Sequence, residues 1–331
     1  MENLSHKTDA PPDGQEGTIM ILTVTLNPCI DHTADVESFT PGATNRVLSS
    51  RRDPSGKGVN VSIVLRRLGI RTVCTGVTRE ENRGLLEETV ERCHIAHDFV
   101  TAPGALRVNL KIFDRAAGVM TECNEQGSPL APESLGEFLE LLDRRLPEAR
   151  MLVLSGSVPP GVPDDIYKTI GLMARKAGVP VVLDTKGPLL HHGLEARPVL
   201  IKPNLDELRE TFGVTPQTAA ETGTVCRAIL RETGLTYLCL SMGAKGALLA
   251  TRDGVWATPG SKVEVRGIQG AGDSMVAGLC AGILRCEEPE KLLAGGAAAA
   301  QGSVEKPGTL LCEREDYLRF LTKVPVQRLS I

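Results

Sequence analysis

The segment Gly270-Ala271-Gly272-Asp273-Ser274 carries the strongest chemical signal, because small residues here lead directly into an apolar helical pattern. Small residues at a helix opening allow a phosphate to approach the backbone, where N–H groups and the positive helix end stabilise its charge. Asp273 would lie beside that phosphate, placed to accept the proton of an attacking hydroxyl. The alternative is that Asp273 and Ser274 only cap an ordinary helix.

A second glycine-containing segment, Ser55-Gly56-Lys57-Gly58-Val59-Asn60, also opens a predicted helix. Gly56 and Gly58 permit close approach of the backbone to a ligand. Lys57 adds a cation, and the Asn60 amide can both donate to and accept from hydroxyl groups. The alternative is a flexible turn with a solvated lysine.

Several charged residues are candidates for binding a phosphorylated, hydroxyl-bearing substrate. Asp31 closely follows the first predicted strand, where a carboxylate can hold two hydroxyls or merely stabilise a turn. Arg107, Asn109 and Lys111 alternate along a predicted strand, so their side chains share one face. Arg46, Arg107 and Lys111 could bind the phosphate of the substrate. The basic strand face could instead protect a sheet edge from pairing.

Three further segments lie where predicted strands end. In Lys202-Pro203-Asn204-Leu205-Asp206-Glu207, the spacing of Asn204 and Glu207 would let one helix turn present both towards hydrated Mg²⁺ and phosphate oxygens. A capping box is the alternative. The turn Ser241-Met242-Gly243-Ala244-Lys245-Gly246 is a candidate nucleotide contact or only a hairpin. Ser157, in the loop after Met151–Ser155, is a candidate for the substrate.

The elements that position these residues follow an alternating pattern from about residue 19 to 325. Apolar strand patterns alternate with helical ones, which predicts an α/β domain with a mainly parallel sheet covered on both faces. Residues 31–55 and 98–124 are strand-like without helices between them. We therefore expect them to form a small β-sheet lid over the carboxyl ends of the main strands. Residues 1–18 are polar and predict a disordered extension.

Composition excludes several classes of function. The 331 residues include 37 basic and 41 acidic ones, a net charge of -4, and only 3% aromatics. This argues against nucleic acid or an anionic membrane surface as a partner. The sequence has no apolar run of about 18 residues, so we expect no membrane span. Nine cysteines without a Cys-x-x-Cys pair favour a reducing, cytoplasmic location. The six histidines form no metal-binding pattern.

In their order and spacing, these motifs resemble the PfkB (ribokinase-like) carbohydrate kinase family. The resemblance runs from about Ile21 to Leu321. Its most specific parts are Gly56-Lys57-Gly58-x-Asn60, Lys202-Pro203-Asn204-x-x-Glu207 and Gly270–Ser274. It implies a ribokinase-like three-layer α/β/α domain with a β-sheet lid, ATP and Mg²⁺ as cofactors, and a homodimer formed through the lid.

The resemblance also implies residue roles. Asp273 would be the catalytic base, with the backbone of Gly270, Ala271 and Gly272 as the anion hole. Glu207 would reach Mg²⁺ through water. The sugar phosphate would be held by Asp31, Gly56, Lys57, Asn60 and Arg107. The nucleotide would face Lys202, Asn204 and the Ser241–Gly246 turn.

Two further segments, Thr25-Leu26-Asn27-Pro28-x-x-Asp31 and Arg107-Val108-Asn109-Leu110-Lys111, resemble the sugar-phosphate branch of the family. The second segment is most like 1-phosphofructokinase. The implied reaction is ATP-dependent phosphorylation of D-fructose 1-phosphate to D-fructose 1,6-bisphosphate. Tagatose-6-phosphate kinase and 6-phosphofructokinase are the alternatives within the family. A non-catalytic sugar-phosphate-binding regulator is the alternative of another class, which the intact Gly-Ala-Gly-Asp segment disfavours.

Overall fold

The structure is a computed structural model that describes residues 21–260 and 263–331. The predicted extension over residues 1–18, and the predicted start of the first strand at Ile19, lie outside the described residues. The strands are β1 Ile21–Thr25, β2 Cys29–Val36, β3 Val47–Ser55, β4 Thr72–Glu81, β5 Ala96–Ala105, β6 Arg107–Asp114, β7 Val119–Asn124, β8 Leu152–Ser155, β9 Val181–Asp184, β10 Leu200–Ile201, β11 Tyr237–Ser241, β12 Ala247–Thr251, β13 Val255–Thr258 and β14 Gln327–Leu329. The α-helices are α1 Lys57–Arg67, α2 Arg83–Arg92, α3 Pro132–Arg145, α4 Ile166–Lys176, α5 Gly187–Gly193, α6 Leu205–Phe212, α7 Ala219–Thr233, α8 Ala271–Leu284, α9 Pro289–Val304 and α10 Arg314–Leu321.

The main sheet has the strand order β14-β13-β12-β11-β10-β9-β8-β1-β4-β5. Its strands run parallel from β11 to β5, whereas β12, β13 and β14 are antiparallel additions at one end. The central strands β1, β8 and β9 are buried along their whole length. Strands buried on both faces read as continuous apolar runs, which is the pattern of a parallel sheet between helical layers.

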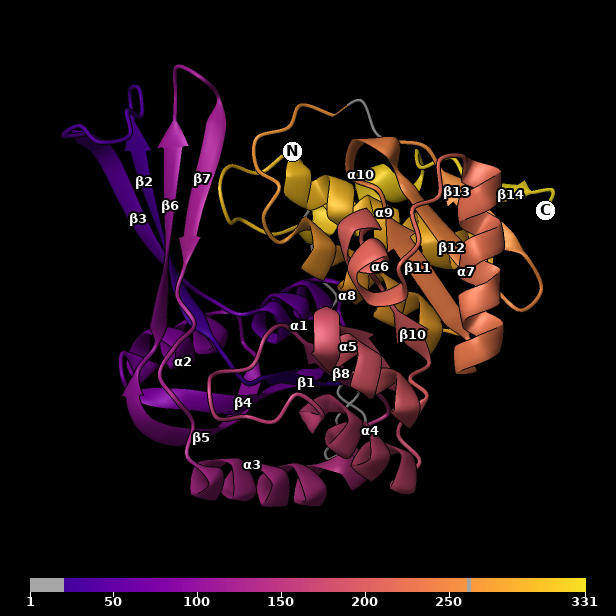
Figure 1. Ribbon diagram of the computed structural model, residues 1–331, viewed down its shortest axis with the longest axis horizontal. Helices are drawn as coiled ribbons and strands as arrows, with labels where there is room; N and C mark the ends of the chain where they lie inside the picture. Colours follow the sequence, from indigo (N-terminus) through magenta and orange to yellow (C-terminus); the bar gives the residue numbers. More distant parts are fainter. Residues whose placement is uncertain (1–20, 261–262) are drawn as a thin grey trace, which may run out of the picture.

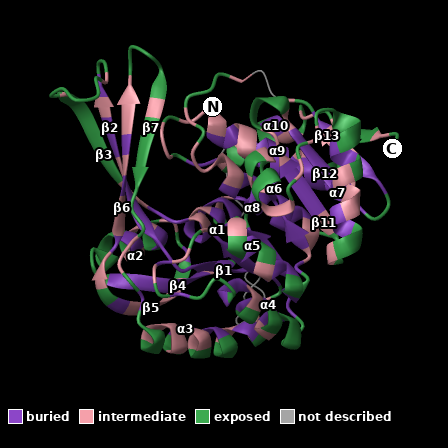
Figure 2. Ribbon diagram, viewed as in Figure 1, coloured by how far each residue is buried: buried purple, intermediate pink, exposed green. Residues whose placement is uncertain are grey.

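Each face of the sheet has its own hydrophobic core. Neighbouring residues of β1 illustrate this, because Ile21 belongs to one core and Leu22 to the other. The first core lies under α1, α8, α9 and α10, and the second lies under α3, α4 and α7 (Figures 1 and 2). Successive side chains of a strand point to opposite faces, so one apolar strand fills two cores. The predicted three-layer α/β/α fold is confirmed.

The lid is a separate four-stranded sheet with the order β3-β2-β6-β7. Its central strands β2 and β6 run parallel, and Asp31 is the register partner of Asn109. The edge strands β3 and β7 are mostly exposed, in contrast to the buried main sheet (Figure 2). The lid therefore stands out from the body and presents one sheet face towards it.

Two predicted boundaries need correction. The predicted lid began near residue 98, but β5 belongs to the main sheet, where it pairs with β4 and buries Ala102 in a core. The chain passes into the lid only at Arg107, and the missing helix between β5 and β6 made the two strands look alike in sequence. The domain was also predicted to end at about 325, whereas β14 extends the main sheet to Leu329.

All nine cysteines lie among the described residues, and all are free thiols. Over the described ranges, no helix combines the length and apolar character needed to cross a bilayer.

Candidate active site

A cavity of about 1270 Å³ lies where the lid faces the carboxyl ends of the central strands. Its wall includes Thr25 and Ser155 at the ends of β1 and β8, and Asp31 and Lys111 from the lid. Typical small-molecule sites are about 300–1000 Å³. The cavity is thus large enough for a nucleotide and a second small substrate side by side.

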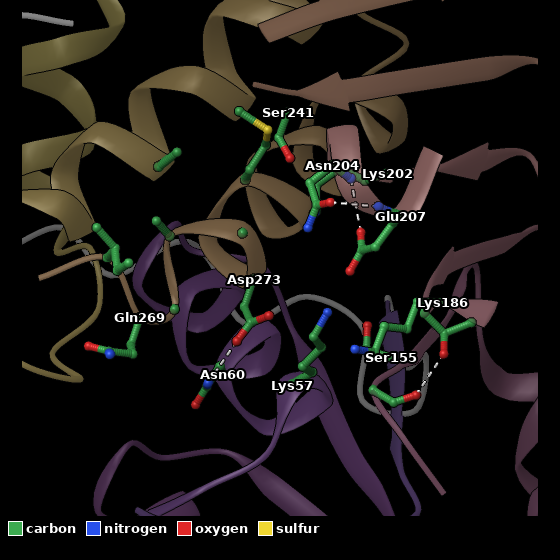
Figure 3. A pocket seen from close by; sticks show the side chains of 18 of the residues that line it. Lys57, Asn60, Ser155, Lys186, Lys202, Asn204, Glu207, Ser241, Gln269 and Asp273 are labelled. Atoms are coloured by element: carbon green, nitrogen blue, oxygen red, sulfur yellow. Dashed lines mark hydrogen bonds between the residues drawn. The ribbon is translucent and has the colours of Figure 1, made fainter. Parts of the chain in front are cut away.

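Asp273 lies in the first turn of α8, facing this cavity (Figure 3). The preceding Gly270 has φ 73°, a left-handed conformation that favours glycine and allows the chain to turn into the helix. Gly270, Ala271 and Gly272 line the cavity beside the carboxylate. The opening turn of a helix carries backbone N–H groups without intrahelical partners and a positive dipole end. A carboxylate and an anion-binding helix end therefore meet at one point of the wall.

Asn60 holds the Asp273 side chain in place. Its Nδ2 donates to Oδ2 of Asp273 at 2.8 Å (Figure 3). Burial raises the pKa of the Asp273 carboxyl above its usual value, and the negative charge of Asp184 acts in the same direction. The positive charge of Lys57 and the Asn60 hydrogen bond oppose that rise. Asp273 is only 7% exposed, which suits a proton acceptor shielded from bulk water.

Asp184 joins two lysines that lie far apart in the sequence. Its Oδ2 is 3.1 Å from Nζ of Lys57, and its Oδ1 is 3.2 Å from Nζ of Lys202. Burial alone would raise the pKa of Asp184, but Lys202 and Lys57 lower it below the usual value. For the Lys57 ammonium group, burial alone would lower the pKa, but the negative charge of Asp184 raises it above the usual value. Lys57 is thus held charged, and its side chain remains 39% exposed for a ligand.

On the lid, Asp31 is fixed by two neighbours from β6. Asn109 Nδ2 donates to Oδ1 of Asp31 at 3.0 Å, and Lys111 Nζ lies 3.0 Å from Oδ2. The Asp31 and Lys111 side chains are 7% and 6% exposed. The predicted common face of Arg107, Asn109 and Lys111 is confirmed, since all three line the cavity. Lys111, however, already neutralises Asp31.

Arg107 is held by backbone carbonyl groups. Its Nε donates to the Asn27 oxygen at 3.1 Å, and its Nη1 donates to the Glu125 oxygen at 3.1 Å. Nη1 also lies 3.5 Å from Oδ1 of Asn109. Within the described part of the chain no bond uses Nη2, so the guanidinium keeps donors for an anion.

The opposite end of the cavity has a different character. Asn204 and Glu207 form the capping box that was the simpler alternative, with bonds of 2.8 and 2.9 Å between side chain and backbone (Figure 3). Both residues also line the cavity, so the box fixes their orientation there. Ser241 N donates to the Pro203 oxygen at 3.0 Å, which places the Ser241 turn beside them. Apolar residues complete this end of the cavity, namely Val263, Ala297, Ala300 and Val304.

The residue types here fit hydrated Mg²⁺ better than a dedicated metal cage. Within residues 21–260 and 263–331, no group of three or more His, Cys, Asp or Glu side chains is placed to hold a metal. Magnesium usually keeps several waters and binds one or two carboxylates together with substrate phosphates. Glu207 is such a carboxylate on the cavity wall.

Most residues predicted from the sequence meet in this cavity, but two do not. The predicted residues that line it are Asp31, Gly56, Lys57, Asn60, Arg107, Asn109, Lys111, Ser157, Lys202, Asn204, Glu207, Ser241, Gly243, Gly246, Gly270, Ala271, Gly272 and Asp273. Arg46 is exposed in the connection before β3, and Lys245 is exposed in its turn; neither is part of the wall.

Asp184 is the main residue that the sequence analysis missed. It ends the apolar strand Val181–Asp184, the same signal that drew attention to Asp31. Gly58 has a different role from the one predicted. A Cβ at Gly58 would lie 2.5 Å from the Val24 carbonyl oxygen, so this glycine allows α1 to pack against β1.

Comparison with known proteins identifies the family. Residues 24–316 match the family model described as pfkB family carbohydrate kinase. The chain is 35% identical over 314 residues to a Bacillus subtilis (strain 168) protein named 1-phosphofructokinase, covering 94% of this chain and 100% of that protein. It is 37% identical over 264 residues to the Rhodobacter capsulatus 1-phosphofructokinase, covering 79% and 83%.

Solved structures that resemble this chain include proteins described as phosphofructokinases. A Thermotoga maritima protein described as a possible 1-phosphofructokinase superimposes with a TM-score of 0.84 at 28% identity, covering 94% of this chain and 100% of that one. Escherichia coli phosphofructokinase-2, in complex with substrates and products, gives a TM-score of 0.88 at 23% identity, covering 92% and 99%. The latter likeness concerns the fold alone. The resemblance inferred from the motifs is confirmed, and the chain belongs to the pfkB family of carbohydrate kinases.

Proposed function

We propose that this protein transfers the γ-phosphoryl group of ATP to the 6-hydroxyl of D-fructose 1-phosphate, giving D-fructose 1,6-bisphosphate and ADP. The relatives named 1-phosphofructokinase, at 31–37% identity over most of the chain, support this acceptor. The observation that carries the chemistry is the buried Asp273, fixed by Asn60 at the start of α8.

In the proposed reaction, Asp273 accepts the proton of the 6-hydroxyl while the hydroxyl oxygen forms the new bond to the γ-phosphorus of ATP. The bond between that phosphorus and the ADP oxygen breaks. Negative charge spreads over the transferred group, where the backbone of Gly270, Ala271 and Gly272 would stabilise it. Lys57 and Lys202 would add positive charge on the same side of the cavity. Lid closure excludes water, which limits simple hydrolysis of ATP.

The two substrates would occupy opposite ends of the cavity. The sugar phosphate would contact Asp31, Gly56, Asn60, Arg107, Asn109, Lys111 and Ser157. Arg107 is favoured for the phosphate, because Lys111 is already paired with Asp31. The nucleotide would lie against Lys202, Asn204, Ser241, Gly243 and Gly246, with its base near the apolar residues around Val263. Bound Mg²⁺, reached through water by Glu207, would neutralise phosphate charge.

We further propose a cytoplasmic homodimer formed through the lid. The nine free cysteines suit a reducing compartment. Val47, Leu48 and Val119, near the free end of the lid, are each more than half exposed, and a second copy would cover them. Sedimentation of the parent and of a Val47→Asp Val119→Asp variant tests this, and a monomeric parent would exclude the dimer.

Coupled turnover with a panel of ketose phosphates tests the acceptor. We expect the highest kcat/KM with fructose 1-phosphate. Equal or better turnover of fructose 6-phosphate or tagatose 6-phosphate would replace the acceptor and leave the kinase chemistry intact. A parent protein that binds sugar phosphate without turning over any member of the panel would indicate the regulator instead.

A further inference from the structure

Both edge strands of the lid are hydrogen-bonded to the body. On β3, Asp53 Oδ2 accepts from Thr309 Oγ1 at 2.7 Å, and Arg51 Nη2 donates to the same Thr309 oxygen at 3.1 Å. Arg51 Nε also lies 2.6 Å from Asp53 Oδ2, so the three side chains form a closed group. Because β3 is at the outer edge of the lid (Figure 1), this group ties one side of the lid to the segment after α9.

The second tie is at the opposite edge. Gln269 Nε2 donates to Glu122 Oε1 of β7 at 2.9 Å, and both residues line the cavity (Figure 3 labels Gln269). Gln269 immediately precedes Gly270, whose left-handed conformation starts α8. The lid is thus bonded to the residue next to the predicted anion hole.

The Thr309 tie reaches the same helix start by a different route. Cys312 N donates to Ser303 Oγ at 2.8 Å, and Ser303 Oγ lies 2.6 Å from Ser274 Oγ in the first turn of α8. Ser274 and Ser303 are fully buried, at 0% and 1% exposure. Leu311 packs so closely against Gly270 that a Cβ added at Gly270 would collide with the Leu311 side chain. The segment that holds Thr309 therefore supports the segment that holds Asp273.

We propose that Gln269 and Thr309 are positioning residues, which fix the start of α8 relative to the lid. The inference rests on the proposed function. The lid carries Asp31 and Arg107, which would hold the acceptor, whereas α8 carries the base and the anion hole. Two ties between these parts set the distance between the acceptor hydroxyl and the γ-phosphate, a distance on which transfer depends steeply.

A double-mutant cycle tests the β7 tie. The variants are Gln269→Leu, Glu122→Leu and the two together. We expect each single variant to lower kcat by about three- to tenfold, the effect of losing a hydrogen bond to a charged group at a partly exposed site. The double variant should be no slower than the slower single variant, since both changes remove the same bond.

Thr309→Val tests the β3 tie, because valine keeps the shape of threonine and loses the hydroxyl. We expect a similar fall in kcat, with the KM for ATP nearly unchanged. ADP formed per molecule of sugar bisphosphate should rise above one, since a loosened lid admits water to the γ-phosphate. Ser49→Ala is the matched control, because its hydroxyl donates to Asp35 Oδ2 at 3.0 Å within the lid and does not tie the lid to the body.

Amide hydrogen exchange of the ligand-free protein gives a readout that needs no acceptor. Peptides spanning residues 47–55 and 119–124 should exchange faster in Thr309→Val and Gln269→Leu than in the parent or in Ser49→Ala. Unchanged exchange and unchanged kcat would overturn the proposal, as would effects of Gln269→Leu and Glu122→Leu that multiply in the double variant. If the parent turns over no ketose phosphate, the proposed function fails. The amide hydrogen exchange rates then decide by themselves whether Gln269 and Thr309 hold the lid to the body.

Discussion

Asn60 Nδ2 lies 2.8 Å from Asp273 Oδ2, although the two residues are 213 positions apart in the sequence. The bond joins the first turn of α1 to the first turn of α8, and thus links the two glycine-containing segments. Asn60 cannot supply or remove a proton in this reaction, so its part is to direct the carboxylate towards the cavity.

Asp273→Asn should lower kcat by about 100- to 10,000-fold, the usual contribution of a general base. Binding of the sugar phosphate, followed by calorimetry, should change little. The thermal midpoint should stay the same or rise, because the variant removes a buried charge and its amide oxygen can still accept from Asn60. A variant that keeps the parent kcat would exclude Asp273 as the base.

Activity should fall on the acid side at a higher pH than an ordinary aspartate would give. Burial, aided by Asp184, raises the pKa of Asp273, and only the ionised form accepts a proton. The pH dependence of folding stability has the opposite sign to that of activity. A carboxyl whose pKa is raised by folding favours the folded state below its unfolded pKa, and this contribution is lost as the pH rises through the folded pKa. The kcat/KM profile should lose its Asp273-dependent acid limb in Asp273→Asn.

Asp184→Asn should lower the free energy of unfolding by about 3–5 kcal/mol at neutral pH, the cost of leaving a buried charge without its partner. Lys202, 5% exposed, bears most of this loss, because the Lys57 side chain can still reach solvent. Urea denaturation measures it. Asp206→Asn is the control, since Asp206 is 84% exposed in its pair with Arg209 and should contribute little.

Lys111→Met should destabilise the fold by about 3–5 kcal/mol, because the buried Asp31 would lose its ion-pair partner. Adding Asp31→Asn should recover most of that loss, since no unpaired charge is left. The double variant should nevertheless keep a raised KM for the sugar phosphate. Recovery of KM together with stability would limit the pair to a structural role.

Two glycine-to-alanine changes should act in opposite directions. Gly58→Ala should cost about 1–3 kcal/mol, because the new Cβ would press on the Val24 carbonyl of β1 at 2.5 Å. Gly136→Ala, inside α3 with open space around the position, should gain about 0.5–1 kcal/mol from the better helix propensity of alanine. Thermal denaturation of both variants checks the pair.

The sequence was informative about the fold wherever elements were long and periodic. The predicted alternation of apolar strands with helices corresponds to the parallel strands of the main sheet and the helices that connect them. It failed at β5, because a strand that continues directly into the lid looks the same as a lid strand until pairing with β4 is known. The short strands β13 and β14 carry too few residues for a pattern, and antiparallel pairing alone defines them.

For the site, glycine-rich helix starts and strand-end polar residues were enough to identify many of the polar residues that line the cavity. The motifs did not reveal pairing between side chains. Nothing local indicates that Lys111 is neutralised by Asp31, or that Asp184 bridges Lys57 and Lys202, because these partners meet only through the folded topology. Arg46 was predicted to bind phosphate from its residue type alone, and it lies in an exposed connection outside the cavity wall.

The origin of the cavity residues also bears on synthesis. Lys57 leaves the ribosome 127 residues before Asp184, and Asp273 follows only near the end of the chain. A nascent chain therefore holds the lysine long before its counter-charge exists, and acquires Asp273 later still. A truncated product that stops before α8 lacks Asp273, the residue proposed as the base.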